Sequence, residues 1–260
     1  KGFMLKWERY FLRMHKGGSR LNGKACFLAL MGGIVLMTGC STDSQAASCP
    51  VPQFDANTKV IALTFDDGPS STTPLVLDKL DQYGVVASFF VCGNNVGEQT
   101  ADTVKRAYDM GCEIHNHSKS HRDMTKLTEE QIRREITETS QRVEAITGEP
   151  TRFFRPPYIA VNDLMYDTVG MPFICGYGSN DWDDKVGVQE RSDKVLAQIH
   201  DGSIILLHDA EGNTKTVEAL DLLIPALQQD GYTLVTVSQL FEAKGVTPDT
   251  HAMYSDVTKD

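Results

Sequence analysis

Residues 60–69 read VIALTFDDGP, an apolar run of strand length that ends in two adjacent carboxylates and a turn. The run Val60–Phe65 shows no polar alternation, which is typical of a parallel strand covered on both faces. Gly68 allows a sharp turn, so we expect Asp66 and Asp67 to approach one point at the end of this strand. The alternative is an ordinary turn that leads into a helix.

Outward from this strand, short apolar runs alternate with helical patterns about seven times. Thr73 before Pro74 predicts a helix with Thr73 as its N-cap, and Thr128 with Gln131 predicts a capping box for a helix over 128–147. The alternation predicts an α/β fold whose parallel sheet, open or closed into a barrel, carries polar groups at its C-terminal edge. Further strands are expected at 85–91, 113–114, 153–154, 171–176, 203–207 and 232–237, and further helices at 100–110, 189–200 and 214–229.

Two histidines four residues apart, His117 and His121, follow the third predicted strand. If one helical turn separates them, both imidazoles face the same side. Two imidazoles and one carboxylate form a donor set that a divalent cation takes at an open, catalytic site. The Asp66–Asp67 pair, at an equivalent strand end, can supply that carboxylate. His115 offers a competing pair with His117, two residues apart on a strand.

Three further polar clusters occur near the ends of predicted strands: Arg155-Pro156-Pro157-Tyr158, Asp181-Trp182 and Leu206-Leu207-His208-Asp209. The two prolines fix an extended path that can hold the Tyr158 N–H outward as a donor. His208 directly follows an apolar strand, so it is expected at the C-terminal end of that strand. The alternatives are a plain surface loop for the first cluster and a buried, hydrogen-bonded histidine for the last.

In order along the chain, these five clusters resemble the motifs of the polysaccharide deacetylase family, also called carbohydrate esterase family 4 or the NodB homology domain. The resemblance covers residues 58–245. It implies a distorted (β/α) barrel with about seven parallel strands and fewer than eight complete units. It also implies one divalent metal ion, Zn²⁺ first with Co²⁺ or Ni²⁺ as alternatives, bound by Asp67, His117 and His121.

The resemblance implies a role for each remaining motif residue. Asp66 corresponds to the general base and His208 to the general acid. The other implied roles are orientation of the base by Arg155, a hydrogen bond from the Tyr158 N–H to the oxyanion, tuning of the acid by Asp181, and substrate contacts from Pro156, Tyr158, Trp182 and Leu206. One position departs from the family pattern, because Gly178 stands three residues before Asp181, where the family often carries an acid.

The implied function is removal of acetyl groups from an extracellular polysaccharide, such as the N-acetylglucosamine of peptidoglycan or a chitin-like glycan. An acetyl xylan esterase, using the same site on an O-acetyl ester, is the first alternative. A catalytically inactive glycan-binding lipoprotein is the second, and loss of Asp66 or His208 would be its sign, but both are present. A glycosidase is disfavoured, because adjacent carboxylates do not match its separation of roughly 5–10 Å.

The N-terminal region resembles a bacterial lipoprotein signal. Basic residues precede the apolar run Ala25–Met37, which is shorter than the roughly 20 residues that span a membrane. The run leads to Cys40, which the resemblance to a lipobox makes the lipidated residue of an exported, membrane-anchored protein on the bacterial surface. Cleavage near Ala47, which would release a secreted protein, and an uncleaved anchor are alternatives. The expected organisation is a signal at 1–39, a polar tether at 40–57, the catalytic domain at 58–245 and a C-terminal tail at 246–260.

Charge is unevenly distributed along the chain. The 260 residues carry a net charge of −10, but residues 1–39 hold seven bases and one acid, which leaves −16 on the other 221. A body this acidic repels phosphate backbones, so nucleic acid is excluded as a partner. The expected partners are an acetylated polysaccharide or oligosaccharide and, through the lipid, a membrane, with a monomer as the default state.

Overall fold

The computed structural model describes residues 58–258; the predicted signal, tether and lipidated Cys40 lie outside the described residues. The strands are β1 (Lys59–Asp66), β2 (Ser88–Val91), β3 (Glu113–Asn116), β4 (Phe173–Ile174), β5 (Tyr177–Gly178), β6 (Ile204–His208), β7 (Tyr232–Val235) and β8 (Met253–Tyr254). The α-helices are α2 (Thr73–Tyr83), α3 (Ala101–Asp109), α4 (Glu129–Thr147), α5 (Asp163–Val169), α6 (Val188–Leu196), α7 (Thr214–Gln229) and α8 (Val237–Lys244). Across residues 58–258, no helix has both the length and the apolar character needed to cross a membrane.

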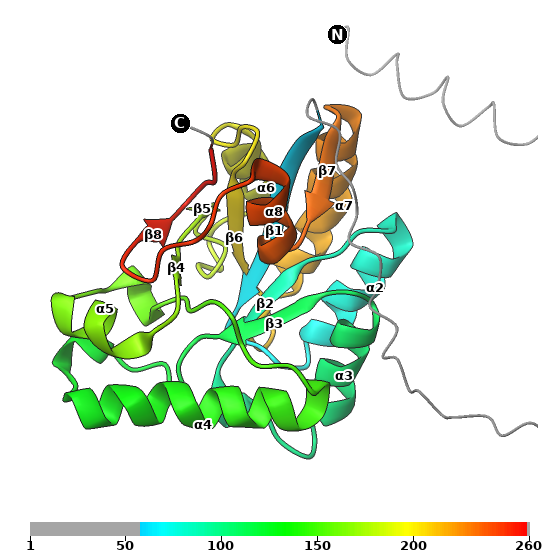
Figure 1. Ribbon diagram of the computed structural model, residues 1–260. Helices are drawn as coiled ribbons and strands as arrows, with labels where there is room; N and C mark the ends of the chain where they lie inside the picture. Colours follow the sequence, from blue (N-terminus) through cyan, green and yellow to red (C-terminus); the bar gives the residue numbers. More distant parts are fainter. Residues whose placement is uncertain (1–57, 259–260) are drawn as a thin grey trace, which may run out of the picture. The chain divides into compact units, whose positions relative to one another are not determined.

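Strand β1 is the centre of the sheet and pairs in parallel with three other strands (Figure 1). One edge pairs with β6. The other edge pairs with β7 along Lys59–Ala62 and then with β2 along Thr64–Asp66. Every β1 residue after Lys59 is buried, which agrees with the absence of polar alternation in the sequence. Both faces of this strand are therefore covered, and its C-terminal end lies between two other strand ends.

Backbone contacts continue from strand to strand until they return to β6. Strand β3 pairs with β2, and a bridge residue, Phe154, links β3 to β4. Strand β4 pairs with β8. The segment after β8 then hydrogen-bonds to the chain before β6, with Ile204 N–H donating to Ser255 O and Val257 N–H donating to Gly202 O. The result is the distorted (β/α) barrel that the resemblance implied.

The closing contacts come from residues 246–258, within the segment 246–260 that was expected to form a tail beyond the domain. Strand β8 lies in this segment, and Val257 is 1% exposed. Val257 packs in one apolar cluster with residues of β1, β6 and α8. Residues 246–258 are thus a structural part of the barrel.

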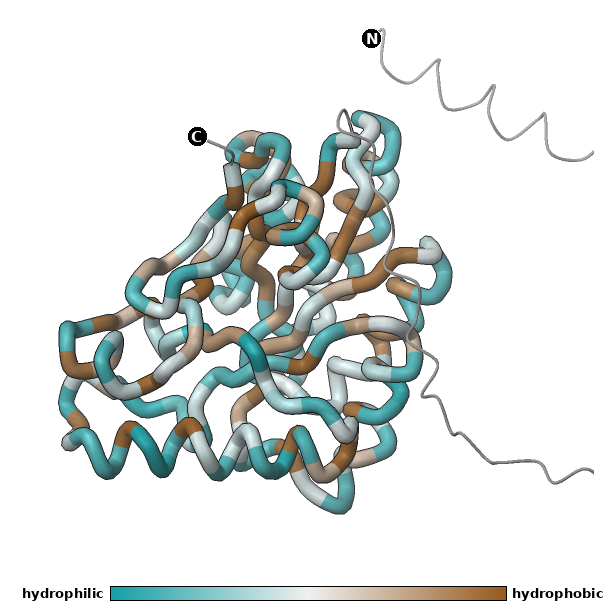
Figure 2. Tube along the Cα trace, in the orientation of Figure 1, coloured by the Kyte–Doolittle hydropathy of each residue, from teal (hydrophilic) through white to brown (hydrophobic). Residues whose placement is uncertain are grey.

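The helices cover the outside of the strands (Figure 1). Helix α4, the longest, begins with the predicted capping box between Thr128 and Gln131 and packs against α3, α5 and β3. In Figure 2 the central strands are coloured mainly as hydrophobic, whereas α4 alternates between hydrophobic and hydrophilic positions. This pattern is that of an amphipathic helix on a buried sheet.

Two local predictions differ from the structure. Thr72, not Thr73, precedes α2, because the Thr73 hydroxyl donates to Asp209 and accepts the Ser70 N–H instead of capping the helix. The strand predicted over 171–176 is reduced to the two residues of β4. The chain bends at Gly176, where φ is +156° and a Cβ would lie 2.8 Å from the Ile204 carbonyl oxygen.

Candidate active site

The end of β1 places two carboxylates beside the end of β6. Asp66 is paired in register with His208, and Asp67 follows in a left-handed conformation with φ of 76°. The next residue, Gly68, donates its N–H to Asp209 Oδ1 at 3.1 Å. A Cβ on Gly68 would lie 2.3 Å from Asp209 Oδ2, so only glycine fits here without movement of the carboxylate. Asp209 therefore fixes the turn that carries Asp67.

Three predicted metal ligands converge on one point. The Oδ1 atom of Asp67 lies 3.5 Å from Nε2 of His117 and 3.3 Å from Nε2 of His121. One donor atom from each residue lies within 4.8 Å of the other two. The Nδ1 atom of His117 lies 2.7 Å from the carbonyl oxygen of Arg155, so its N–H donates there and Nε2 keeps its lone pair. The donor set and the tautomer both fit a single divalent cation.

The two imidazoles do not meet through a helical turn, so that part of the prediction is wrong. Residues 117–121 form a loop in which Ser118 and His121 have φ values of 64° and 53°. These left-handed residues turn the chain so that His121 faces Asp67. The alternative pair does not form, because the buried His115 ring contacts Phe90 and its Nε2 lies 3.0 Å from Glu113.

Arg155 holds the carboxylate of Asp66 in place. Its guanidinium is fully buried and donates to Asp66 Oδ1 at 2.6 Å and to Thr64 Oγ1 at 2.8 Å. Another N–H bonds to the Cys175 carbonyl oxygen. The second oxygen of Asp66 lies 3.8 Å from His117 Nε2 and so faces the predicted metal position. The carboxylate is thereby oriented with one oxygen held and the other directed into the site.

His208 forms a tight pair with Asp181. Nδ1 lies 2.8 Å from Asp181 Oδ1, and the His208 backbone N–H donates to Asp181 Oδ2, also at 2.8 Å. Burial lowers the pKa of His208, but the hydrogen bond and charge of Asp181 outweigh it and raise the pKa to about 9. The imidazole is therefore protonated at neutral pH.

Sequence reasoning missed the residues that hold Asp181. Thr216 Oγ1 donates to Asp181 Oδ2 at 2.8 Å. Arg191, which is 1% exposed, donates to both Thr216 and Asn213. The only signal for Arg191 was its place in an amphipathic helix, where an arginine is expected on the surface. Its burial depends on the packing of α6 against α7.

The predicted substrate contacts differ in exposure. Tyr158 and Trp182 are 68% and 67% exposed, whereas Pro156 is buried and Leu206 is half-buried. The Tyr158 ring lies edge-on to His121 at a centroid distance of 4.7 Å. Among the hydrogen bonds of residues 58–258, none uses the Tyr158 N–H, which leaves it available as a donor.

Gly178, where the family often carries an acid, lies on β5 against β6. A Cβ at this position would lie 3.3 Å from the Leu206 carbonyl oxygen, which is tighter than most Cβ contacts. Its own carbonyl oxygen accepts a hydrogen bond from Gln198. Close packing of β5 and β6 therefore favours glycine here.

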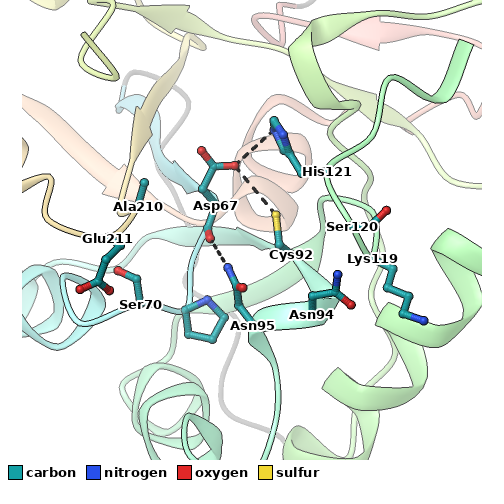
Figure 3. Close-up of a pocket in the computed structure, with 11 residues that line it drawn as sticks. Asp67, Ser70, Cys92, Asn94, Asn95, Lys119, Ser120, His121, Ala210 and Glu211 are labelled. Carbon is teal, nitrogen blue, oxygen red and sulfur yellow. Dashed lines mark hydrogen bonds and ion pairs between the residues drawn. The ribbon is translucent and has the colours of Figure 1, made fainter. Parts of the chain in front are cut away.

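A pocket of about 450 Å³ opens beside Asp67 and His121 (Figure 3). Its lining is mainly polar and comes from the loops after β1, β2, β3 and β6. Cys92 is 6% exposed, and its Sγ lies 3.9 Å from Asp67 Oδ1. The residues drawn in Figure 3 include Asn94, Asn95, Lys119, Ser120 and Glu211.

Residues 54–171 match the family model described as polysaccharide deacetylase. The chain is 51% identical over 193 residues to a bifunctional xylanase/deacetylase of Pseudobutyrivibrio xylanivorans, a match that covers 74% of this chain and 32% of the relative. It is 39% identical over 197 residues to the peptidoglycan-N-acetylglucosamine deacetylase PgdA of Listeria monocytogenes, covering 75% and 41%. The chain thus spans about a third to two fifths of the length of these curated relatives.

A solved structure matches over nearly its whole length. It is the family 4 acetyl xylan esterase of Clostridium thermocellum in complex with a cobalt ion, with a TM-score of 0.75 and 40% identity. The match covers 76% of this chain and 99% of that chain. The barrel, the five motifs in order and these similarities agree, and this chain belongs to the polysaccharide deacetylase family.

Proposed function

We propose that this chain is a metal-dependent hydrolase that removes acetyl groups from an extracellular polysaccharide. The observation that carries the proposal is the convergence of Asp67, His117 and His121 beside Asp66 and His208, which lie in register on neighbouring strands. Membership of the family supports the reaction class. The metal is Zn²⁺ in the first instance, with Co²⁺ and Ni²⁺ as alternatives, and the cobalt in the esterase structure supports a divalent ion.

The side chains around the donor set suit acetyl hydrolysis. A divalent cation supplies a Lewis acid and makes water a stronger nucleophile at neutral pH. Asp66, oriented by Arg155, accepts the proton of the attacking water. His208, protonated because of Asp181, donates a proton to the leaving nitrogen or oxygen. The Tyr158 N–H donates to the oxyanion, a contact whose loss costs about 3 kcal/mol in comparable sites.

The substrate is proposed to be an acetylated polysaccharide of plant or bacterial walls. Peptidoglycan and chitin-like glycans carry N-acetyl groups, whereas xylan carries O-acetyl groups. The identity of 51% to the xylanase/deacetylase exceeds the 39% to the peptidoglycan deacetylase, which favours acetylated xylan. Exposed Trp182 and Tyr158 offer flat apolar faces to sugar rings of either kind.

Acetate release from a substrate panel tests this proposal. The full chain, loaded with Zn²⁺, Co²⁺ or Ni²⁺, is incubated with acetylxylan, N-acetyl chito-oligosaccharides and peptidoglycan. Faster release from acetylxylan supports the esterase, and faster release from the N-acetylated glycans supports the deacetylase. No release from any substrate, together with binding to one of them, would support an inactive glycan-binding protein instead.

We also propose that the chain is exported and anchored through lipid on Cys40. The support is the basic segment, the apolar run and the lipobox-like sequence before that cysteine. In a bacterial host, metabolic labelling with a palmitate analogue should mark the wild type but not Cys40→Ala. Labelling of both proteins, or of neither, would refute lipidation at this residue. The detergent-solubilised protein is expected to be a monomer.

A further inference from the structure

A buried carboxylate outside the five motifs lies directly behind the loop that carries both histidines. Glu135 belongs to α4 and is 8% exposed. Its Oε2 atom accepts the backbone N–H groups of Lys119 and Ser120 at 2.9 and 2.8 Å. Its Oε1 atom accepts the Ser120 hydroxyl at 2.7 Å. One side chain thus accepts three hydrogen bonds from Lys119 and Ser120, two of the three residues between the histidines.

These bonds fix a loop whose backbone is otherwise unfavourable. Ser118 and His121 adopt left-handed conformations, which cost roughly 1–2 kcal/mol for each non-glycine residue. The Ser118 N–H bonds to Asn116 Oδ1, and the His121 N–H bonds to Ser118 Oγ. The N–H groups of residues 119 and 120 have only Glu135 as acceptor among the hydrogen bonds of residues 58–258. Without Glu135, two amides in the middle of the loop lose their partner.

The helix that presents Glu135 is well fixed. Helix α4 has 19 residues and a complete capping box, and it packs against β3, the strand that leads into the loop. Asn116, at the end of β3, also donates its side-chain amide to the Ile136 carbonyl oxygen. The helix, the strand end and the loop are therefore joined at adjacent residues. A change at Glu135 should act on the loop and not on the strand.

We propose that Glu135 is a positioning residue for the metal site, holding the loop 117–121 so that the imidazole of His121 faces Asp67 and His117. This inference rests on the proposed metal-dependent function. Its physical basis is that charge-assisted hydrogen bonds are stronger than neutral ones, and that groups holding the ligands of a metal set its affinity. Among the hydrogen bonds of residues 58–258, the Glu135 carboxylate bonds to Lys119 and Ser120 and to none of the three metal ligands, so it acts through the loop between the two histidines.

The same helix supplies a matched control. Glu138 lies three residues further along α4, and its carboxylate pairs with the Lys119 ammonium at 2.5 Å. Among the hydrogen bonds of residues 58–258, none joins Glu138 to a backbone N–H of the loop. Glu135→Gln and Glu138→Gln therefore remove the same charge from the same helix beside the same loop residue. Only the first changes the acceptor of the loop amides.

The experiment measures the dissociation constant for Zn²⁺ of the purified full chain by competition with a fluorescent chelator. Glu135→Ala is expected to bind Zn²⁺ at least tenfold more weakly than the wild type, within the range seen for residues that support metal ligands. The dissociation constant of Glu135→Gln should lie between those of the wild type and Glu135→Ala, because the amide oxygen of glutamine still accepts hydrogen bonds. The dissociation constant of Glu138→Gln should stay within twofold of the wild-type value. Thermal unfolding of the metal-free proteins is recorded alongside.

The outcomes separate this inference from the proposed function. A wild type that binds no Zn²⁺ overturns the metal site and this inference together. A wild type that binds Zn²⁺ while folded Glu135→Ala binds it less than tenfold more weakly overturns only the inference. If Glu135→Ala does not fold, Glu135→Gln decides: a dissociation constant at least three times that of Glu138→Gln supports positioning, and a smaller ratio refutes it.

Discussion

At the scale of single residues, the two adjacent carboxylates of the site lie in different environments. Asp66 receives a hydrogen bond from a buried guanidinium, whereas Asp67 lies next to two imidazoles. Burial raises the pKa of Asp67, but hydrogen bonding and charge from His117, with the other histidines, outweigh it and lower the pKa to about 2. Asp67 is therefore ionised at neutral pH, which suits the metal-ligand role that we propose for it.

Replacing Asp66 should remove catalysis and leave metal binding in place. Asp66→Asn keeps the shape of the side chain but cannot accept the proton of water, so kcat should fall by about 10²–10⁴. Asp67→Ala should instead lose the metal. Acetate release and Zn²⁺ binding, measured on both variants, check this division. Equal loss of Zn²⁺ binding in Asp66→Asn and Asp67→Ala would contradict these separate roles.

The pH dependence of activity should reveal the Asp181–His208 pair. The pKa of His208 is raised to about 9 from 6.5, so the acid stays protonated, and kcat/KM should hold up to about pH 9 before falling. The same pairing stabilises the fold fully below pH 6.5, and that stability is lost as pH rises through 9.

The test of this assignment is Asp181→Asn, which removes the largest of the charges that raise the pKa of His208, ahead of those of Asp66 and Asp67. Its fall in kcat/KM should occur at a lower pH by at least one unit. The measurement is a pH profile from 6 to 10 on the metal-loaded full chain. An unchanged alkaline limb would show that another group sets it.

At the scale of elements, the turn after β1 requires Gly68 for two reasons, and only one of them was evident from the sequence. Gly68 was expected because of its freedom to turn, but the structure shows that the Asp209 carboxylate occupies the place of its Cβ. Gly68→Ala should move the turn and weaken Zn²⁺ binding by roughly tenfold or more, as other supporting residues do. Gly97→Ala is the control, because nothing lies within 4 Å of a Cβ there. Equal metal affinities for the two variants would argue against a fixed turn.

At the scale of the whole molecule, closure of the barrel depends on the residues after α8. Val257 is 1% exposed and belongs to the cluster that joins β1, β6 and α8. Val257→Ala should lower the free energy of unfolding by about 2 kcal/mol, because it leaves a small cavity in a packed interior. Met253→Ala, at a residue that is 36% exposed, should change it by about 0.5 kcal/mol or less. Urea unfolding of both variants gives the comparison, and similar losses would contradict a closing role.

The sequence by itself determined the α/β alternation, the capping box at Thr128 and the identity of the residues that could form a site. Those features depend on hydropathy, turn chemistry and residue type, which are local properties. Parallel strands that end at one edge predicted that the Asp66–Asp67 pair would lie near the two histidines, and the family resemblance assigned the ligand role to Asp67.

Only the tertiary structure decided how these residues meet. The left-handed loop at Ser118 and His121 is unfavourable in isolation, and it is held by Glu135, which lies on another element. Arg191 is buried because its own helix, α6, packs against α7, and β8 pairs with the edge that β4 offers. Such contacts join residues far apart along the chain, so their free energy exists only once the barrel has closed and no local pattern encodes them.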